Sequence, residues 1–334
     1  MTTMTHALLR ARFDLWSRHV AATKRPILIG PWTSEVGFEC LYWLPFLAHW
    51  RERYGIDKAR LVAIGRGGSA TWYDAGGQAD LYDHIPVRDV RLQTWMRAKA
   101  TGSVKQGAVA PWERHLVGLV ALSLNIRRYH LLHPAWMYRL LRPYWADQMT
   151  LRGLQQLTTY RQMPAPPLPP GMDLPASFTA VRFYARPTMP PAEDVVLWAQ
   201  RLTERLAETR PVILLHSGGQ YDDHADMVQP VPGKVFALPP LPPSENLAIL
   251  SAVLARSAGF VGTYGGFAQL ALCHGIPSVS FWQQWGGTAL AHLTLSHTLS
   301  VVSGVPFAAG TLAGSEFVAG LFKKPAPKPG EGHA

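Results

Sequence analysis

The chain has 334 residues, 48% of them hydrophobic and 16% charged, a composition that excludes an intrinsically disordered protein and allows large buried cores. This length exceeds that of one typical core and predicts two domains. The formal net charge of +10 at pH 7 indicates an anionic partner, and because no nucleic-acid-binding motif is present we expect no nucleic-acid partner.

The N-terminal region mixes arginines with apolar residues over positions 1–20, which predicts a short amphipathic helix rather than a secretory signal. The longest apolar run, residues 116–126, is shorter than the roughly 20 residues that span a bilayer. Cys40 and Cys273 lie in apolar segments without the spacing of a metal site, which is typical of reduced thiols in the cytoplasm. We therefore expect a cytoplasmic protein, and its basic charge leaves peripheral contact with the inner face of a membrane open.

The first half begins as an α/β domain. Residues 26–30 (PILIG) predict a buried strand, and residues 40–54 predict an aromatic-rich helix closed by Gly55. A second strand is expected at residues 61–65 (LVAIG), followed directly by residues 66–69 (RGGS). Glycines at the ends of both strands are typical of an open parallel sheet, whose ligands bind beyond the carboxyl ends of its strands.

Residues 80–160 are mostly helical in pattern, with helices expected at 90–99, 112–126 and 134–149. We interpret this stretch as a helical insert in the first domain. Its arginines and aromatic residues interleave, which suits either a packed helical face with solvated arginines or contact with a membrane, and we favour the packed face.

Residues 163–175 (MPAPPLPPGMDLP) form the one proline-rich stretch between two structured halves and predict a stiff linker. The predicted domains therefore span residues 1–165 and 176–322. Residues 323–334 (KKPAPKPGEGHA) are expected to be a loose tail.

The second half alternates strands and helices at short loop spacing, which predicts a doubly wound parallel sheet. The expected strands lie at residues 178–184, 211–216, 235–238, 260–261 and 278–282, and the expected helices at 191–208, 244–256, 267–273 and about 307–321.

One stretch of the second half carries the clearest functional signal. Residues 259–282 (GFVGTYGGFAQLALCHGIPSVSFW) predict a strand, a glycine-rich turn, a short helix and a further strand. Gly265 and Gly266 allow close approach of the backbone to a ligand, and the helix N-terminus after them can hold an anion. The alternative is an ordinary turn in which the glycines serve geometry alone. We prefer the phosphate site, because the turn lies in the last such unit of the second domain.

Residues 238–282 (LPPLPPSENLAILSAVLARSAGFVGTYGGFAQLALCHGIPSVSFW) resemble the carboxyl-terminal domain of GT-B glycosyltransferases, including heptosyltransferase-like and fucosyltransferase-like enzymes. Residues 30–47 (GPWTSEVGFECLYWLPFL) resemble the start of uncharacterised bacterial proteins of polysaccharide-synthesis type. The resemblance implies an α/β fold of two Rossmann-like doubly wound domains, in which the glycine turn and its helix hold the diphosphate of a nucleotide sugar. It places these contacts at Thr263, Tyr264, Gly265, Gly266 and Phe267.

Two further strand ends are candidates for the donor site. Arg182 and Arg186 follow the first strand of the second half, where a guanidinium could neutralise the leaving diphosphate, although Arg182 could also be a plain surface residue. His216, Gly218 and Gly219 end the next strand and suit close approach of a ligand.

The acidic residues that follow do not predict a metal site. Residues 222–224 (DDH) could bind a ribose or cap a turn, but three adjacent side chains do not easily converge on one ion. We therefore expect neither a metal nor another cofactor besides the nucleotide-sugar donor.

The first domain is expected to supply the catalytic base. An inverting transferase needs a group that takes the proton of the acceptor hydroxyl, and the candidates in order are Glu35 and Glu39, with Asp74 and His84 in reserve. The alternative for both glutamates is stabilisation of a helix N-terminus. The glycine turn lacks the paired acids of many retaining GT-B enzymes, which favours inversion.

The sequence therefore predicts a glycosyltransferase of polysaccharide biosynthesis, which moves a sugar from a nucleotide-sugar donor to a glycan or lipid-linked acceptor. The chain has no G-x-G-x-x-G fingerprint after its first strand, no Walker A motif and no G-x-S-x-G elbow. Two alternatives stay open. One is a sugar-nucleotide epimerase of the same architecture, and the other is a non-catalytic binding or scaffold protein that keeps the cleft.

Overall fold

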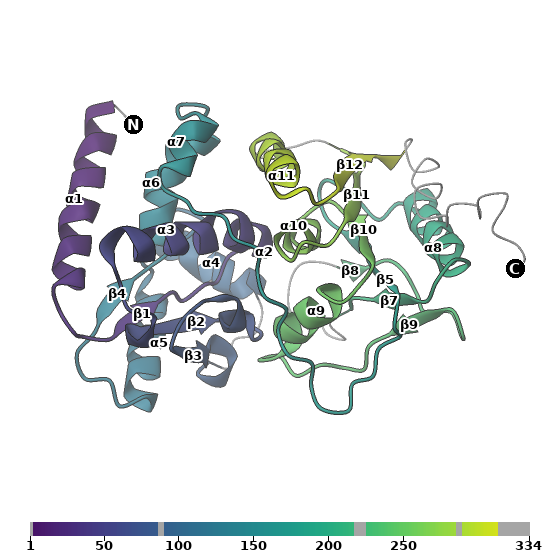
Figure 1. Cartoon of the computed structure of the whole chain (residues 1–334), viewed down its shortest axis with the longest axis horizontal. Coiled ribbons are helices and arrows are strands. Elements are labelled where there is room, and N and C mark those ends of the chain that lie inside the picture. Colours follow the sequence, from purple (N-terminus) through teal and green to yellow (C-terminus); the bar gives the residue numbers. More distant parts are fainter. Residues whose placement is uncertain (1–2, 86–89, 217–224, 285–288, 313–334) are drawn as a thin grey trace, which may run out of the picture.

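The structure, a computed structural model, describes residues 3–85, 90–216, 225–284 and 289–312. The chain forms two lobes, each built on a parallel sheet (Figure 1). The sheet of the first lobe has the order β3-β2-β1-β4. Its strands are β1 (Ile27–Ile29), β2 (Leu61–Gly65), β3 (Gly77–Asp80) and β4 (His130–Leu132).

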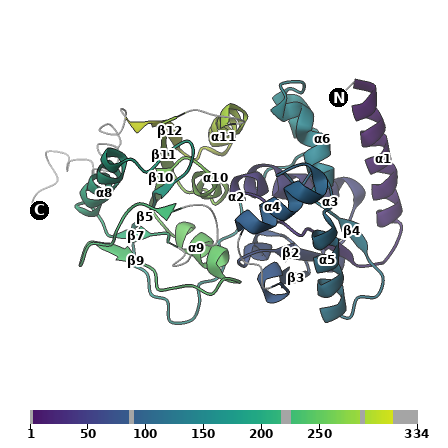
Figure 2. The same cartoon turned by 180° about the vertical axis from the view of Figure 1, so that it is seen from behind.

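Helices cover both faces of the first sheet. Ile27 and Ile29 of β1 point into a large core with the aromatic side chains of the N-terminal helices, whereas Leu28 points to the other face, where α5 packs (Figure 2). This alternation follows from the two-residue period of a strand. The helices of the first lobe are α1 (Thr3–Ala21), α2 (Val36–Phe38), the π-helix η1 (Glu39–Trp43), α3 (Leu44–Tyr54), η2 (Lys58–Arg60), η3 (Ser69–Trp72), η4 (Leu81–Asp83), α4 (Val90–Thr101), α5 (Pro111–Ser123), α6 (Ala135–Trp145) and α7 (Leu151–Gln155).

The second lobe contains a six-stranded parallel sheet with the order β12-β11-β10-β5-β7-β9. A short antiparallel pair, β6 with β8, lies beside it. The strands are β5 (Thr179–Arg182), β6 (Tyr184–Ala185), β7 (Val212–Leu214), β8 (Ala225–Asp226), β9 (Val235–Ala237), β10 (Gly259–Thr263), β11 (Ser278–Trp282) and β12 (Phe307–Thr311).

The second sheet is also covered on both faces. Val181 and Val261 pack against α8, whereas Ala180 and Phe260 face the other side with α9 and α10. The core on the Ala180 and Phe260 side is continuous with the core of the first lobe, so the two lobes share buried apolar surface. The helices of this lobe are α8 (Glu193–Ala207), α9 (Asn246–Leu254), α10 (Gly266–Cys273) and α11 (Ala289–Ser303).

The predicted α/β class with two doubly wound sheets is confirmed, and one local prediction is wrong. The helix expected at about 307–321 is replaced at its start by strand β12, which pairs in parallel with β11, and the helix α11 precedes it. Pairing with a sheet edge outweighs the weak helical pattern of this alanine-containing segment. The segment 80–160 is mainly helical as expected, but it also supplies β4, which pairs with β1.

The loose tail predicted for residues 323–334 lies outside the described residues. None of the helices within 3–85, 90–216, 225–284 and 289–312 is long and apolar enough to cross a membrane.

Candidate functional site

The two lobes meet most closely where α2 packs against the start of α10 (Figure 1). A Cβ atom built on Gly266 would lie 2.9 Å from the Cβ atom of Val36 and 3.1 Å from the backbone nitrogen of Gly37. A Cβ atom on Gly37 would collide with the Gln269 side chain. We call Val36, Gly37, Gly266 and Gln269 the glycine contact. A side chain at Gly266 would press on Val36 and on the backbone of Gly37, whereas one at Gly37 would displace the end of the Gln269 side chain.

A second pair of glycines has the same role after β2. Gly67 and Gly68 adopt positive φ angles of +60° and +80°, in the region that favours glycine. The backbone N–H of Ala248 in α9 donates to the carbonyl of Gly67 at 2.9 Å, and a Cβ atom on Gly68 would lie 2.6 Å from that of Ala248. These glycines therefore bring the strand end of the first lobe against the second lobe.

Charged side chains from both lobes gather beside the glycine contact. The Nζ atom of Lys105 lies 2.7 Å from Oε1 of Glu35 and 4.2 Å from the centre of the Phe38 ring. The ring of His292 meets the same phenylalanine edge-on, with centres 4.7 Å apart. Arg186 and His292 of the second lobe interact electrostatically with Glu35. We call Glu35, Lys105, Arg186 and His292 the charged cluster.

The charged cluster fixes the protonation of its members. The surrounding protein desolvates Glu35, which raises its pKa, but Lys105, Arg186 and His292 outweigh this effect and leave the pKa below its usual value. Burial lowers the pKa of His292 to about 4, helped by Lys105 and Arg186 and opposed by Glu35. At neutral pH the cluster therefore holds an ionised Glu35 carboxylate and a neutral His292 imidazole beside the basic side chains of Lys105 and Arg186.

Arg186 lies directly on the glycine-rich turn. Its Nη1 atom donates to the carbonyl oxygen of Tyr264 at 3.1 Å, and a Cβ atom on Gly265 would lie 2.6 Å from Nη1. Its Nε atom is buried and has no hydrogen-bond partner in the described part of the chain. The guanidinium therefore places positive charge at the N-terminus of α10.

Arg182, in contrast to the contact of Arg186 with the turn, is buried at 4% exposure and packs against Phe267 in the first turn of α10. Its Nε atom donates to Oδ1 of Asp226 at 3.2 Å, and the guanidinium carbon lies 4.6 Å from the centre of the Phe267 ring. His216 ends the neighbouring strand, and burial lowers its pKa. Gly218, Gly219 and the DDH motif at 222–224 lie outside the described residues.

Thr263 is fully buried at the end of β10. Its hydroxyl accepts from the backbone N–H of Tyr184 at 3.0 Å and donates to the carbonyl of Tyr184 at 3.1 Å. The hydroxyl thereby holds β10 to β6 and fixes the strand end from which the turn starts.

Glu39 is enclosed rather than open to the charged cluster. It is 0% exposed, and its Oε1 atom accepts from the hydroxyls of Tyr73 at 2.6 Å and Ser69 at 3.1 Å. Burial raises the pKa of Glu39 to about 7, although Tyr73, Arg66 and Ser69 act in the opposite direction. Of the reserve candidates, Asp74 pairs with basic side chains of its own lobe.

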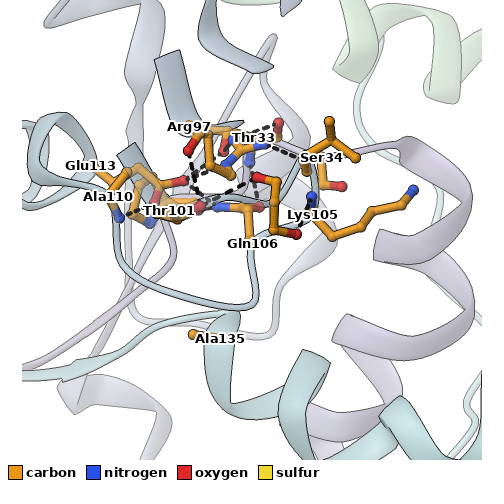
Figure 3. A network of polar contacts seen from close by, with 12 residues as sticks. Thr33, Ser34, Arg97, Thr101, Lys105, Gln106, Ala110, Glu113 and Ala135 are labelled. Carbon is orange, nitrogen blue, oxygen red and sulfur yellow. Dashed lines mark hydrogen bonds and ion pairs between the residues drawn. The ribbon is translucent and has the colours of Figure 1, made fainter. Parts of the chain in front are cut away.

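A buried polar network holds the loop that carries Lys105 (Figure 3). The neighbouring Gln106 donates from Nε2 to the carbonyl of Pro31 and to Oε1 of Glu113, both at 2.9 Å, and its Oε1 accepts from the backbone N–H of Thr33 at 3.1 Å. Because Pro31 and Thr33 belong to the loop that leads to Glu35, Gln106 ties the two partners of the ion pair together.

The centre of this network is an ion pair without solvent contact. Arg97 and Glu113 are 1% and 0% exposed, with Nε and Oε1 3.1 Å apart (Figure 3). Burial raises the pKa of Glu113, but His133 and Arg97 outweigh it and lower the pKa to about 2. Glu113 is therefore ionised at neutral pH.

The structure thus brings three of the predicted candidates together, namely Glu35, Arg186 and the glycine turn. It adds Lys105 and His292, which no sequence pattern predicts because neither belongs to a motif or directly follows a predicted strand. Within the four described segments, no group of three or more histidine, cysteine, aspartate or glutamate side chains is placed to hold a metal ion.

No family model and no curated protein matches this chain. Among solved structures it is similar to the heptosyltransferase WaaC of E. coli, solved with ADP (TM-score 0.43, 14% identity, covering 89% of this chain and 100% of WaaC). It is also similar to a glycosyl transferase family 9 protein of Veillonella parvula (TM-score 0.41, 12% identity, 93% and 94% covered). The heptosyltransferase TibC, solved with ADP-D-beta-D-heptose, matches with a TM-score of 0.40 at 12% identity, over 78% of this chain and 59% of TibC. Similarity at this level does not assign the chain to a family.

Proposed function

We propose that this chain is a glycosyltransferase that moves a sugar from a nucleotide-sugar donor to a glycan or lipid-linked acceptor. The observation that carries the proposal is the charged cluster. The ionised Glu35 carboxylate of the first lobe pairs with Lys105 and interacts electrostatically with Arg186. Arg186 in turn donates a hydrogen bond to the glycine turn of the second lobe. Such an arrangement can bind a diphosphate and remove a proton at one place.

The donor diphosphate is assigned to the turn before α10. Backbone N–H groups at the N-terminus of a helix carry partial positive charge and attract phosphate. The Arg186 guanidinium lies against Gly265 and can bind phosphate oxygens through its remaining donors. The arginine neutralises the charge that develops on the leaving nucleoside diphosphate, so the proposed reaction needs no metal ion.

Glu35 is assigned the role of general base. The acceptor hydroxyl oxygen attacks the anomeric carbon of the donor, the bond from that carbon to the diphosphate oxygen breaks, and the hydroxyl proton passes to Glu35. The side chain of Glu35 is 62% exposed, so an acceptor can reach it, and its lowered pKa keeps it ionised. A single displacement of this kind inverts the anomeric configuration.

Binding of nucleoside diphosphates tests the donor site. We expect Arg186→Ala to raise the Kd for the preferred nucleoside diphosphate by about 10- to 100-fold, because it removes a charge-assisted contact of about 1.5–3 kcal/mol. Calorimetry with ADP, UDP and GDP measures this change, and ADP is included because WaaC is solved with it. Arg114→Ala, which removes an exposed arginine of α5, is the matched control. Equal affinities of both variants and the parent protein would contradict the donor site.

A further inference from the structure

The only two cysteines of the chain lie on facing helices of different lobes. Cys40 in η1 follows Gly37 by three residues, and Cys273 at the end of α10 follows Gln269 by four. Residues at these spacings lie on one face of a helix. The close approach that brings Gly37 against Gln269 at the glycine contact therefore continues along the helices to the two cysteines.

The Cys273 thiol lies against the backbone of Cys40. The Sγ atom of Cys273 lies 3.9 Å from the carbonyl oxygen of Cys40, and the two thiol groups are close enough to interact electrostatically. A disulfide needs Cα atoms about 4.4–6.8 Å apart and side chains that point toward each other. Helices held together through glycine meet this condition more easily than helices separated by large side chains.

A cavity gives small molecules access to the pair. It has a volume of about 410 Å³, and its lining includes both cysteines together with Trp72, Tyr73 and Met163. Cys273 is half-buried, whereas Cys40 is 2% exposed. A reagent in the cavity therefore reaches the sulfur of Cys273 first.

We propose that Cys40 and Cys273 are a modification site at which a small disulfide such as glutathione disulfide converts the thiol pair into a disulfide between the lobes. The Cys273 thiolate attacks one glutathione sulfur, forms a mixed disulfide and releases one glutathione thiolate. The Cys40 thiolate then attacks the Cys273 sulfur, forms the protein disulfide and releases the second glutathione. Two electrons pass from the cysteine pair to the glutathione disulfide, and the two cysteine protons are released with the products.

The cross-link joins the lobes close to the glycine contact and opposes their separation. Burial raises the pKa of the Cys40 thiol well above its ordinary value, so the second step needs a thiolate that forms less readily. The modification does not depend on the proposed transferase activity, because neither sulfur belongs to the charged cluster.

The test compares native and denatured protein in glutathione buffers of graded oxidised-to-reduced ratio. After quenching, free thiols are alkylated under denaturing conditions and intact masses are measured. We expect the native chain to lose both alkylation sites at a ratio that leaves the chain in urea fully alkylated, since only the fold holds the distant cysteines together. The midpoint ratio should differ by at least about 10-fold.

Two outcomes would overturn the proposal. One is equal midpoints for native and denatured protein, and the other is loss of thiols only through glutathione adducts or cross-linked dimers. Cys273→Ser is the control for specificity. In this variant Cys40 must either be alkylated as a free thiol or carry one glutathione, because the chain then contains no second cysteine with which it could form a disulfide. The comparison of native and denatured parent protein needs no variant and stays valid if a substitution impairs folding.

Discussion

The glycine contact and the charged cluster share adjacent residues in the sequence but differ in packing and solvent exposure. Glu35 belongs to the charged cluster, and Val36 and Gly37 belong to the glycine contact. In the glycine contact two backbones approach so closely that no side chain fits between them. In the charged cluster the Glu35 and Lys105 side chains are 62% and 37% exposed. The glycine contact therefore holds the two lobes against each other, and the charged cluster leaves room for a ligand.

The two glutamates of this segment show the same division. Glu35 is open and ionised, because nearby cations lower its pKa. Glu39, one helical turn later, is fully buried, and burial raises its pKa to about 7. Only three residues lie between the exposed Glu35, which is proposed to accept a proton, and Glu39, which is enclosed by Tyr73 and Ser69. The first predictions separate these roles.

The largest effect is expected for Glu35→Gln, which removes the proposed base but keeps its size. General base catalysis contributes about 100- to 10,000-fold, so the transfer rate should fall within that range while the Kd for the nucleoside diphosphate stays nearly constant. Release of nucleoside diphosphate from a nucleotide sugar in the presence of acceptor measures the rate. Glu208→Gln, at an exposed position after α8, is the control. A parent-like rate in the Glu35 variant would assign the base elsewhere.

Glu39→Gln is expected to change stability in a pH-dependent manner. The pKa of Glu39 is about 7 in the folded chain against an ordinary value of 4.5, so the protonated form favours folding. This stabilisation is fully present below pH 4.5 and is lost as the pH rises through about 7. Between about pH 5 and pH 8 the parent should lose on the order of 3 kcal/mol of unfolding free energy relative to the variant. Urea unfolding at both pH values measures it, and parallel pH profiles would refute the buried state of Glu39.

Gly266→Ala tests the glycine contact. The added Cβ atom would lie 2.9 Å from the Cβ atom of Val36, so the lobes must shift. We expect a loss of about 1–3 kcal/mol in unfolding free energy. Gly118→Ala is the matched control, since a Cβ atom there meets nothing within 4 Å, and alanine should stabilise α5 by about 0.5–1 kcal/mol. If both alanine substitutions stabilised the protein, the close packing at Gly266 would be contradicted.

The sequence predicts the strands of the fold better than it predicts which residues the glycines contact. Apolar runs such as 61–65 mark the buried parallel strands, because both faces of such strands are covered. The edge strand β12 at Phe307–Thr311 has no such signal, since half of an edge strand is exposed. The sequence places Gly67 and Gly68 directly after a strand, but the residues that they contact lie in the other lobe. No local pattern contains that information.

The site divides in the same way. Glu35 and Arg186 follow predicted strands, so the rule that ligands bind at the carboxyl ends of strands selects both as candidates. Lys105 comes from a loop between two helices, and it reaches Glu35 only because Gln106 and the buried Arg97–Glu113 pair hold that loop. Residues placed by a tertiary network of this kind carry no spacing signal in the sequence.

Lys105→Ala should have the smallest effect on stability and a clear effect on the pH dependence of transfer. The ion pair with Glu35 is partly exposed, so its removal should cost less than about 1 kcal/mol. Lys105 lowers the pKa of Glu35, and without it the pKa rises. Because the base acts when it is ionised, the acid limb of kcat/KM should move to higher pH. Lys58→Ala breaks a comparable exposed pair with Asp74 in the same lobe and should leave the profile in place. An unmoved acid limb in the Lys105 variant would mean that Glu35 is not the group that titrates, and the charged cluster would then bind the donor without supplying the base.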